Sequence, residues 1–245
     1  MIDVKFKYQA SIFLDAKDIT PNTETVLTLV GQLKEHGFIS GTFQEIMPPI
    51  LHPQPRLRLM SQNEEWNIGI ASQKIDIEKI PIDLKGDNLG ELDVYCSEAM
   101  SFFAKIYEKY PKKAHRLALI TTYLLGEMTE PKLSSINETL FNQPSFYKEN
   151  PPFDWDWKST ARIEKEFAKL IEPLNIACIL QRRKGDFQVK DQSMSFDRIF
   201  VTLDINTVST TSECRFEFPH VKAFYDIAQV MHSDLLKSIT EFISV

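Results

Sequence analysis

The chain has 245 residues, of which 43% are hydrophobic and 25% charged, and its formal net charge is −6 at pH 7. This length and composition are typical of one large or two small globular domains and exclude an intrinsically disordered protein. The negative charge disfavours broad nonspecific binding to nucleic acid or anionic lipid, and a content of only eight glycines disfavours a fold built on glycine-rich phosphate loops.

The three cysteines, Cys96, Cys178 and Cys214, lie far apart in the sequence and form no CxxC pair. We therefore expect neither a disulfide framework nor a structural zinc site. Residues 1–15 alternate between polar and apolar side chains, unlike the continuous apolar core of a signal peptide. No apolar run approaches the roughly 18 residues that a membrane span needs. These patterns predict a cytoplasmic protein without a cofactor and without membrane contact.

The first elements of the chain are a strand and a short helix. Strict alternation over residues 4–14 predicts a strand with one buried and one solvent-facing side. A helix is expected to begin near Thr20, which is a suitable N-cap, and to end before Gly37. A stiff connection, neither helix nor central strand, is expected where four prolines follow, namely Pro48, Pro49, Pro53 and Pro55.

Short strands then lead to a long helix. The strand candidates flank polar turns and comprise residues 56–60, 66–71 and 75–77. From Leu92 to Tyr110, apolar side chains recur at spacings of three and four, which predicts an amphipathic helix that Pro111 terminates.

The second part of the chain starts with its most apolar strand candidate, residues 115–125. A weak helix is expected at 133–141, followed by a long loop at 143–157. The pattern leaves Trp155–Leu170 open between strand and helix. Two better strands and a final amphipathic helix complete this part, at residues 174–181, 198–205 and 219–242.

Because the order of elements repeats, we predict an α+β fold made of two pseudo-repeated halves, residues 1–111 and 112–245. In each half a mostly antiparallel sheet is covered by a long amphipathic helix. The alternative is that the two halves form one continuous domain.

Several short segments carry a resemblance to a family. They are the strand Phe6–Leu14, the pair Pro48-Pro49 before Arg56–Met60, the strand Leu203-Asp204-Ile205, and His232 with Ser238-Ile239-Thr240. In this order the chain resembles a sporadically distributed, uncharacterised bacterial family of proteins of about this length. The resemblance spans nearly the whole chain and implies a fold, but it supplies no catalytic residues. The patchy distribution of the family suggests a link to a bacterial defence or toxin–antitoxin partner.

The first candidate site residue is His232, which follows Met231 on the final helix and lies near Asp234. One interpretation makes it a general base or a polar contact at the seam between the halves. The simpler interpretation, which we favour, is a boundary histidine that is hydrogen-bonded to a neighbour. The spacing of the histidines does not predict a metal site.

The second candidate is the pair Asp154 and Asp156, which flank Trp155. In a strand both carboxylates would share one face, where they could bind a divalent ion or divide acid and base roles. Lys158 would then be the nearby lysine that a nuclease needs. The favoured alternative is a half-buried strand with the tryptophans inside and the aspartates outside.

The third candidate is the run Arg182, Arg183 and Lys184, which precedes Gly185 and Asp186 between two strand candidates. It is expected to form an exposed basic hairpin that contacts an acidic partner or a phosphate. A solvated hairpin tip without a function would give the same pattern.

The chain contains no Walker A loop, GxSxG, HExxH or Rossmann glycine motif. We therefore predict a non-catalytic binding or regulatory module that acts through protein–protein contacts, with a homodimer as one form of assembly. The alternative is a metal-dependent hydrolase or nuclease that uses Asp154 and Asp156. A nucleic-acid-binding module that uses the basic hairpin is the third hypothesis.

Overall fold

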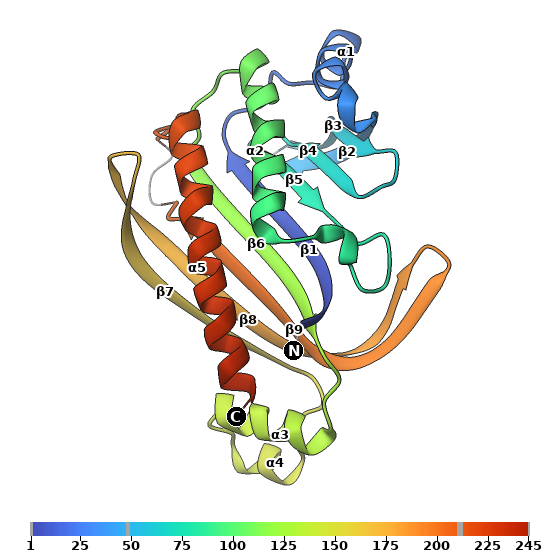
Figure 1. The fold of residues 1–245 in the computed structure, drawn as a ribbon, viewed down its shortest axis with the longest axis vertical. Helices are drawn as coiled ribbons and strands as arrows, with labels where there is room; N and C mark the ends of the chain where they lie inside the picture. The colour runs from blue at the N-terminus through green and yellow to red at the C-terminus, as the bar shows by residue number, and fades with distance from the viewer. Residues whose placement is uncertain (1, 48–49, 210–212, 245) are drawn as a thin grey trace.

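The computed structural model describes residues 2–47, 50–209 and 213–244. Nine described strands form one sheet in the order β2-β3-β4-β5-β1-β6-β9-β8-β7, and every neighbouring pair is antiparallel (Figure 1). The strands are β1 (Ile2–Phe13), β2 (Phe38–Met47), β3 (Ile50–Ser61), β4 (Trp66–Ile70), β5 (Lys74–Lys79), β6 (Arg116–Leu125), β7 (Trp155–Phe167), β8 (Leu170–Val189) and β9 (Gln192–Thr207).

The helices lie on one face of this sheet and at its two ends (Figure 1). They are α1 (Thr23–Gln32), α2 (Leu92–Lys109), α3 (Glu130–Leu140), α4 (Ser145–Glu149) and α5 (Phe218–Ser244), with two 3₁₀ turns, η1 (Lys34–His36) and η2 (Asp87–Leu89). Helices α2 and α5 lie side by side across the sheet, whereas α3 and α4 lie together near the C-terminal end of α5.

The single sheet shows that the prediction of two halves, each with its own sheet under a long helix, is wrong. Strand β1 pairs with β6 from Ile2–Leu125 to Phe13–Arg116, so the first strands of the two predicted halves meet at the centre. Of the described helices only α5, with 27 residues, runs along most of the molecule, and it contacts β6, β9 and β7. Alternation specifies which face of a strand is buried, but it does not specify which strands pair.

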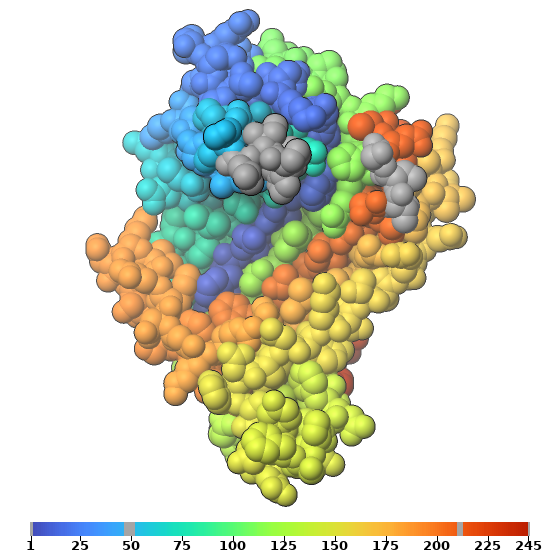
Figure 2. Space-filling model, turned by 180° about the vertical axis from the view of Figure 1, so that it is seen from behind, coloured from blue at the N-terminus to red at the C-terminus, as the bar shows by residue number. Residues whose placement is uncertain are grey.

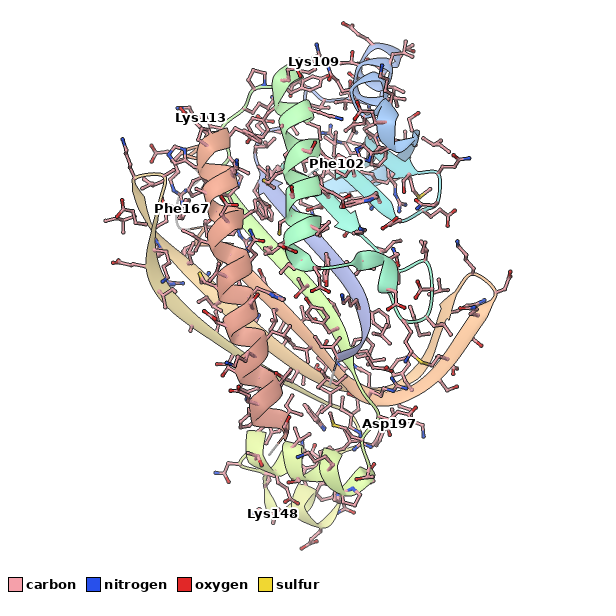
Figure 3. The ribbon with its side chains drawn as sticks, in the orientation of Figure 1. Phe102, Lys109, Lys113, Lys148, Phe167 and Asp197 are labelled. Carbon is pink, nitrogen blue, oxygen red and sulfur yellow. The ribbon has the colours of Figure 1, made fainter. Side chains whose placement is uncertain are left out.

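The main core lies between the sheet and the two central helices. On α2, the expected spacing buries Tyr95 and Phe102, and the Tyr95 hydroxyl donates a hydrogen bond to the carbonyl of Ile77 at 2.6 Å. Phe102, labelled in Figure 3, meets the edge of Trp66 with ring centroids 5.0 Å apart. On α5, the ring of Phe224 packs edge to face with that of Phe167 on β7, and the ring centroids are 6.1 Å apart. Phe167 is labelled in Figure 3. The aromatic side chains therefore anchor the two helices to different strands on the same face of the sheet, α2 to β4 and β5 and α5 to β7.

The opposite face of the sheet carries polar side chains. Figure 2 shows that the middle strands are not covered by a helix on this side. The polar groups bind one another across strands: the Ser11 hydroxyl donates to Asp76 at 2.7 Å, and the Asn175 amide donates to Asn206 at 3.2 Å. These cross-strand hydrogen bonds give a partner to polar side chains that are partly or fully buried on this face.

The structure decides two local predictions, one for the proline-rich segment and one for Trp155–Leu170. Pro53 and Pro55 lie inside β3, so the expected stiff connection is wrong at these positions, and Pro48 and Pro49 lie outside the described residues. Strand β3 accommodates the prolines because it pairs with β4 only from Leu57 to Met60. Trp155–Leu170, which was open between strand and helix, forms β7 and the turn into β8.

Candidate functional site

The predicted basic hairpin does not exist as a hairpin tip. Arg182, Arg183 and Lys184 lie within β8, and the turn between β8 and β9 is at residues 190–191. Arg182 is only 2% exposed, and its guanidinium binds Asp197 on β9 at 2.9 Å and Glu130 of α3 at 2.5 Å. The ion pairs with Asp197 and Glu130 raise the pKa of Arg182 further above its ordinary value. The sequence pattern predicts a turn at residues 182–184 because the carboxylates that pair with Arg182, Asp197 and Glu130, are not adjacent to it in the chain.

Arg183 faces the other side of the sheet, where the predicted carboxylate pair lies. Its guanidinium binds both Asp154 and Asp156, the latter at 2.5 Å. The two carboxylates therefore share one face, as expected, with Trp155 buried on the other. One arginine thus neutralises part of the charge that a divalent ion would need. Among the residues that the structure describes, no group of three or more His, Cys, Asp or Glu side chains is arranged to hold a metal ion.

His232 lies at the seam between α5 and β6, buried to 3% exposure. Its Nε2 atom is 2.9 Å from the hydroxyl of Thr121 and 3.1 Å from that of Tyr123. The hydroxyl of Tyr8, on the neighbouring strand β1, donates to the carbonyl of Gly90 at 3.3 Å. These side chains form a polar cluster at the edge of an apolar core, and a rotation of α5 would break both contacts of His232.

Burial controls the ionisation of this cluster. Removal from water lowers the pKa of His232 to about 4, because the charged imidazolium is disfavoured there. The same desolvation raises the pKa of Tyr8 to about 12 and raises the pKa of Tyr123 even further. The imidazole and both phenols are therefore neutral near pH 7.

A cleft of about 440 Å³ lies beside this cluster, between α5 and the start of α2. Lys5 lines it and donates to the carbonyl of Gly90 at 2.7 Å while pairing with Glu91 at 3.2 Å. Tyr8, Tyr123 and His232 themselves line this cleft, but the Nε2 atom of His232 is already engaged by the hydroxyls of Thr121 and Tyr123. The geometry therefore favours His232 as a structural polar contact over a general base, which must reach the proton it removes.

The two edges of the sheet differ more sharply than these clusters. At one edge, the exposed side chains of β7 include six charges: Asp156, Lys158, Arg162, Glu164, Lys165 and Glu166. At the other edge, those of β2 are uncharged: Ile39, Ser40, Gly41, Thr42, Gln44 and Ile46. The charged residue of β2, Glu45, is half-buried and accepts a hydrogen bond from the backbone of Ser72 at 3.0 Å.

Strand β2 is the feature that the sequence patterns missed. Its aromatic and β-branched residues after Gly37 are typical of a strand, but Gly41 and the following prolines obscure the alternation. Ile39 and Ile46 are each 60% exposed. An edge strand also presents unpaired backbone N–H and C=O groups, so β2 combines free hydrogen-bonding groups with exposed apolar side chains.

No described helix combines the length and apolar character that crossing a membrane requires. No protein-family model matches the chain, and no curated protein is significantly similar to it in sequence.

Proposed function

We propose that this protein is a non-catalytic binding module that acts through protein–protein contacts, and that its β2 edge pairs with an extended segment of a partner protein. The observation that carries the proposal is the contrast between the two edges: β7 is covered with charges, whereas the exposed side chains of β2 have none. Natural sheets protect their edges with charges, so an edge without them is suited to pairing with another strand.

The dimensions of β2 suit this mode of binding. The strand has ten residues, which is long enough to hydrogen-bond an added strand over several positions. Backbone hydrogen bonds would provide affinity, and the exposed side chains of Ile39 and Ile46 would select apolar side chains on the partner. The pairing of Arg183 with both candidate carboxylates, Asp154 and Asp156, supports this interpretation over a metal-dependent hydrolase.

The test compares two threonines at matched positions on the two edges. A photo-crosslinking amino acid replaces either Thr42 on β2 or Thr160 on β7, both exposed, in cells that produce the full chain. We expect a discrete adduct with a second protein from position 42 but not from position 160. Ile39→Lys should abolish that adduct, whereas Ala161→Lys on β7 should leave it unchanged.

Three results would contradict the proposal. The first is the absence of an adduct from position 42, and the second is the same set of adducts from both edges. The third is an adduct between two copies of this chain, which would replace the partner protein by a homodimer.

A further inference from the structure

A second hollow lies far from the β2 edge, at the end of the molecule where α3 and α4 sit (Figure 1). It has a volume of about 370 Å³, and its walls come from α3, α4, the segment between them and the start of β7. Lys148 of α4, labelled in Figure 3, marks this end. The volume is within the range of pockets that bind small molecules.

Two residues that line this hollow carry a buried hydrogen-bond donor without an acceptor. Trp155 is 7% exposed and Asn137 is 4% exposed, yet neither Trp155 Nε1 nor Asn137 Nδ2 has a hydrogen-bond partner among the described residues. The Asn137 side-chain oxygen, in contrast, accepts from the Gln143 amide. Most buried polar groups in folded proteins are paired, so two orphaned donors at one hollow indicate that an acceptor from outside the chain completes them.

The other residues that line the hollow indicate what kind of ligand would carry this acceptor. Phe141 meets Trp155 edge to face, with ring centroids 5.8 Å apart, and Tyr147 and Pro144 add further apolar surface. Flat aromatic groups pack well against such walls. The carboxylate of Asp154 also lines the hollow and is half exposed. Arg183 binds its Oδ1 atom, so Oδ2 is the atom that would repel an anion and accept a hydrogen bond from a neutral N–H group.

We propose that this hollow binds a small neutral ligand in which an amide is attached to an aromatic ring. Small rotations of Trp155 and Asn137 would bring their buried donors, Nε1 and Nδ2, to the amide carbonyl, and the amide N–H would donate to Asp154. The ring would pack between Phe141 and Tyr147. This site is independent of the β2 edge, because it involves none of the same residues.

Three probes with the same ring separate the contributions. Benzamide offers an acceptor and a donor, benzoate offers acceptors with a negative charge, and benzylamine, which is protonated at neutral pH, offers donors with a positive charge. The readout is the ¹H–¹⁵N signal of the Trp155 indole, assigned with Trp155→Phe, while Trp66 and Trp157 serve as internal references. We expect benzamide to shift the Trp155 indole signal, and benzoate and benzylamine to bind at least several-fold more weakly.

Neighbouring residues of α4 provide a matched pair of variants. Tyr147 lines the hollow, whereas Phe146 is 64% exposed and does not line it. Tyr147→Ala should weaken benzamide binding by about tenfold, the order of one lost aromatic contact. Phe146→Ala should leave it unchanged. The proposal is overturned if benzamide leaves the Trp155 signal in place, if benzoate binds as tightly, or if both variants behave alike.

Discussion

The β7 end and the β2 end of the sheet are attached to the molecule in different ways. Strand β7 pairs with β8 at every position from Trp155 to Phe167 without a register shift. At the other end, the β2–β3 hairpin joins the sheet only through the short ladder Leu57–Met60 and contains a register shift near Glu45. The firmly attached edge is also the charged one, whereas the weakly attached edge is uncharged.

This difference indicates that the two ends are suited to different tasks. The continuous pairing at β7 and the ion pairs of Arg182 and Arg183 make that end rigid and discourage association. The short pairing of β3 with β4 leaves the β2–β3 hairpin able to open locally, at a lower free energy than global unfolding. A strand that adjusts its position can accept a partner strand more readily.

Acidification gives the largest expected effect, because it weakens the centre that both ends share. The folded-state pKa of His232, about 4, lies below the ordinary value of 6.5. As the pH falls through this window, the unfolded chain takes up a proton and the folded one does not, so stability is lost. Between pH 6.5 and pH 4, the free energy of unfolding should fall by about 3 kcal/mol through His232. Urea unfolding between pH 7 and pH 4 should show this loss in the wild type and a smaller one in His232→Asn.

Hydrogen exchange during the same titration would sharpen the comparison. Amides of β8, which exchange through global unfolding, should lose protection in acid. Amides of β2, which exchange through local opening, should change little. If both strands lose protection equally, the hairpin does not open on its own.

The second prediction concerns two adjacent arginines at the β7 end. Arg182→Met removes a buried guanidinium from Glu130 and Asp197 and should destabilise the fold by about 2 kcal/mol. It should also return the pKa of Asp197, now lowered by Arg182, toward its ordinary value. Arg183→Met acts on a partly exposed group and should cost less than about 1 kcal/mol. Urea unfolding measures the loss of stability in each variant. Equal losses would contradict the burial of Arg182 and the partial exposure of Arg183.

The third prediction concerns the attachment of the β2 end. Arg56 is buried, donates to the carbonyl of Ala16 at 2.6 Å and contacts Glu45 at 3.5 Å. Arg56→Met should reduce stability by about 1 kcal/mol, the order of one hydrogen bond. The effect should be local, so hydrogen exchange should accelerate in β2 and β3 but not in β8. Uniform acceleration would show that the hairpin unfolds only with the whole sheet.

The smallest effect on stability is expected when the charges of the two edges are exchanged. Ser40→Lys with Gln44→Glu places two charges on β2, and Lys158→Thr with Lys165→Thr removes two of the six charges from β7. All four side chains are exposed, so unfolding free energy should change by less than about 0.5 kcal/mol per substitution. Crosslinking from position 42 should nevertheless disappear. If it persists, edge charge does not control association.

Much of the local structure could be predicted because its signals are local. Alternation located β1 and β6 to within two residues at their ends, and the spacing of apolar residues located α2 and α5. These patterns reflect one buried face on each element, which neighbouring residues in the sequence establish. Strand β2 escaped prediction because an edge strand with both Ile39 and Ile46 exposed has no such buried face to repeat.

The candidate site residues were identified by type, but their roles depended on distant partners. His232 contacts Thr121, which lies 111 positions earlier, and Arg182 contacts Glu130, 52 positions earlier. The sequence around Arg182 indicated an exposed turn, yet these partners allow a charged side chain to be buried within a strand. The orphaned donors of Trp155 and Asn137 have no signature in the sequence at all, because they are defined by the absence of a neighbour.

The amino-acid pattern alone was sufficient for the kind of element at most positions, for which faces are apolar, and for the absence of familiar catalytic motifs. Tertiary structure alone decided that nine strands form one sheet, that β1 meets β6 at its centre, and that β2 is left at an uncharged edge. The reason is physical. Periodicity is set by interactions within an element, whereas strand order, buried ion pairs and hollows depend on contacts between segments far apart in the chain.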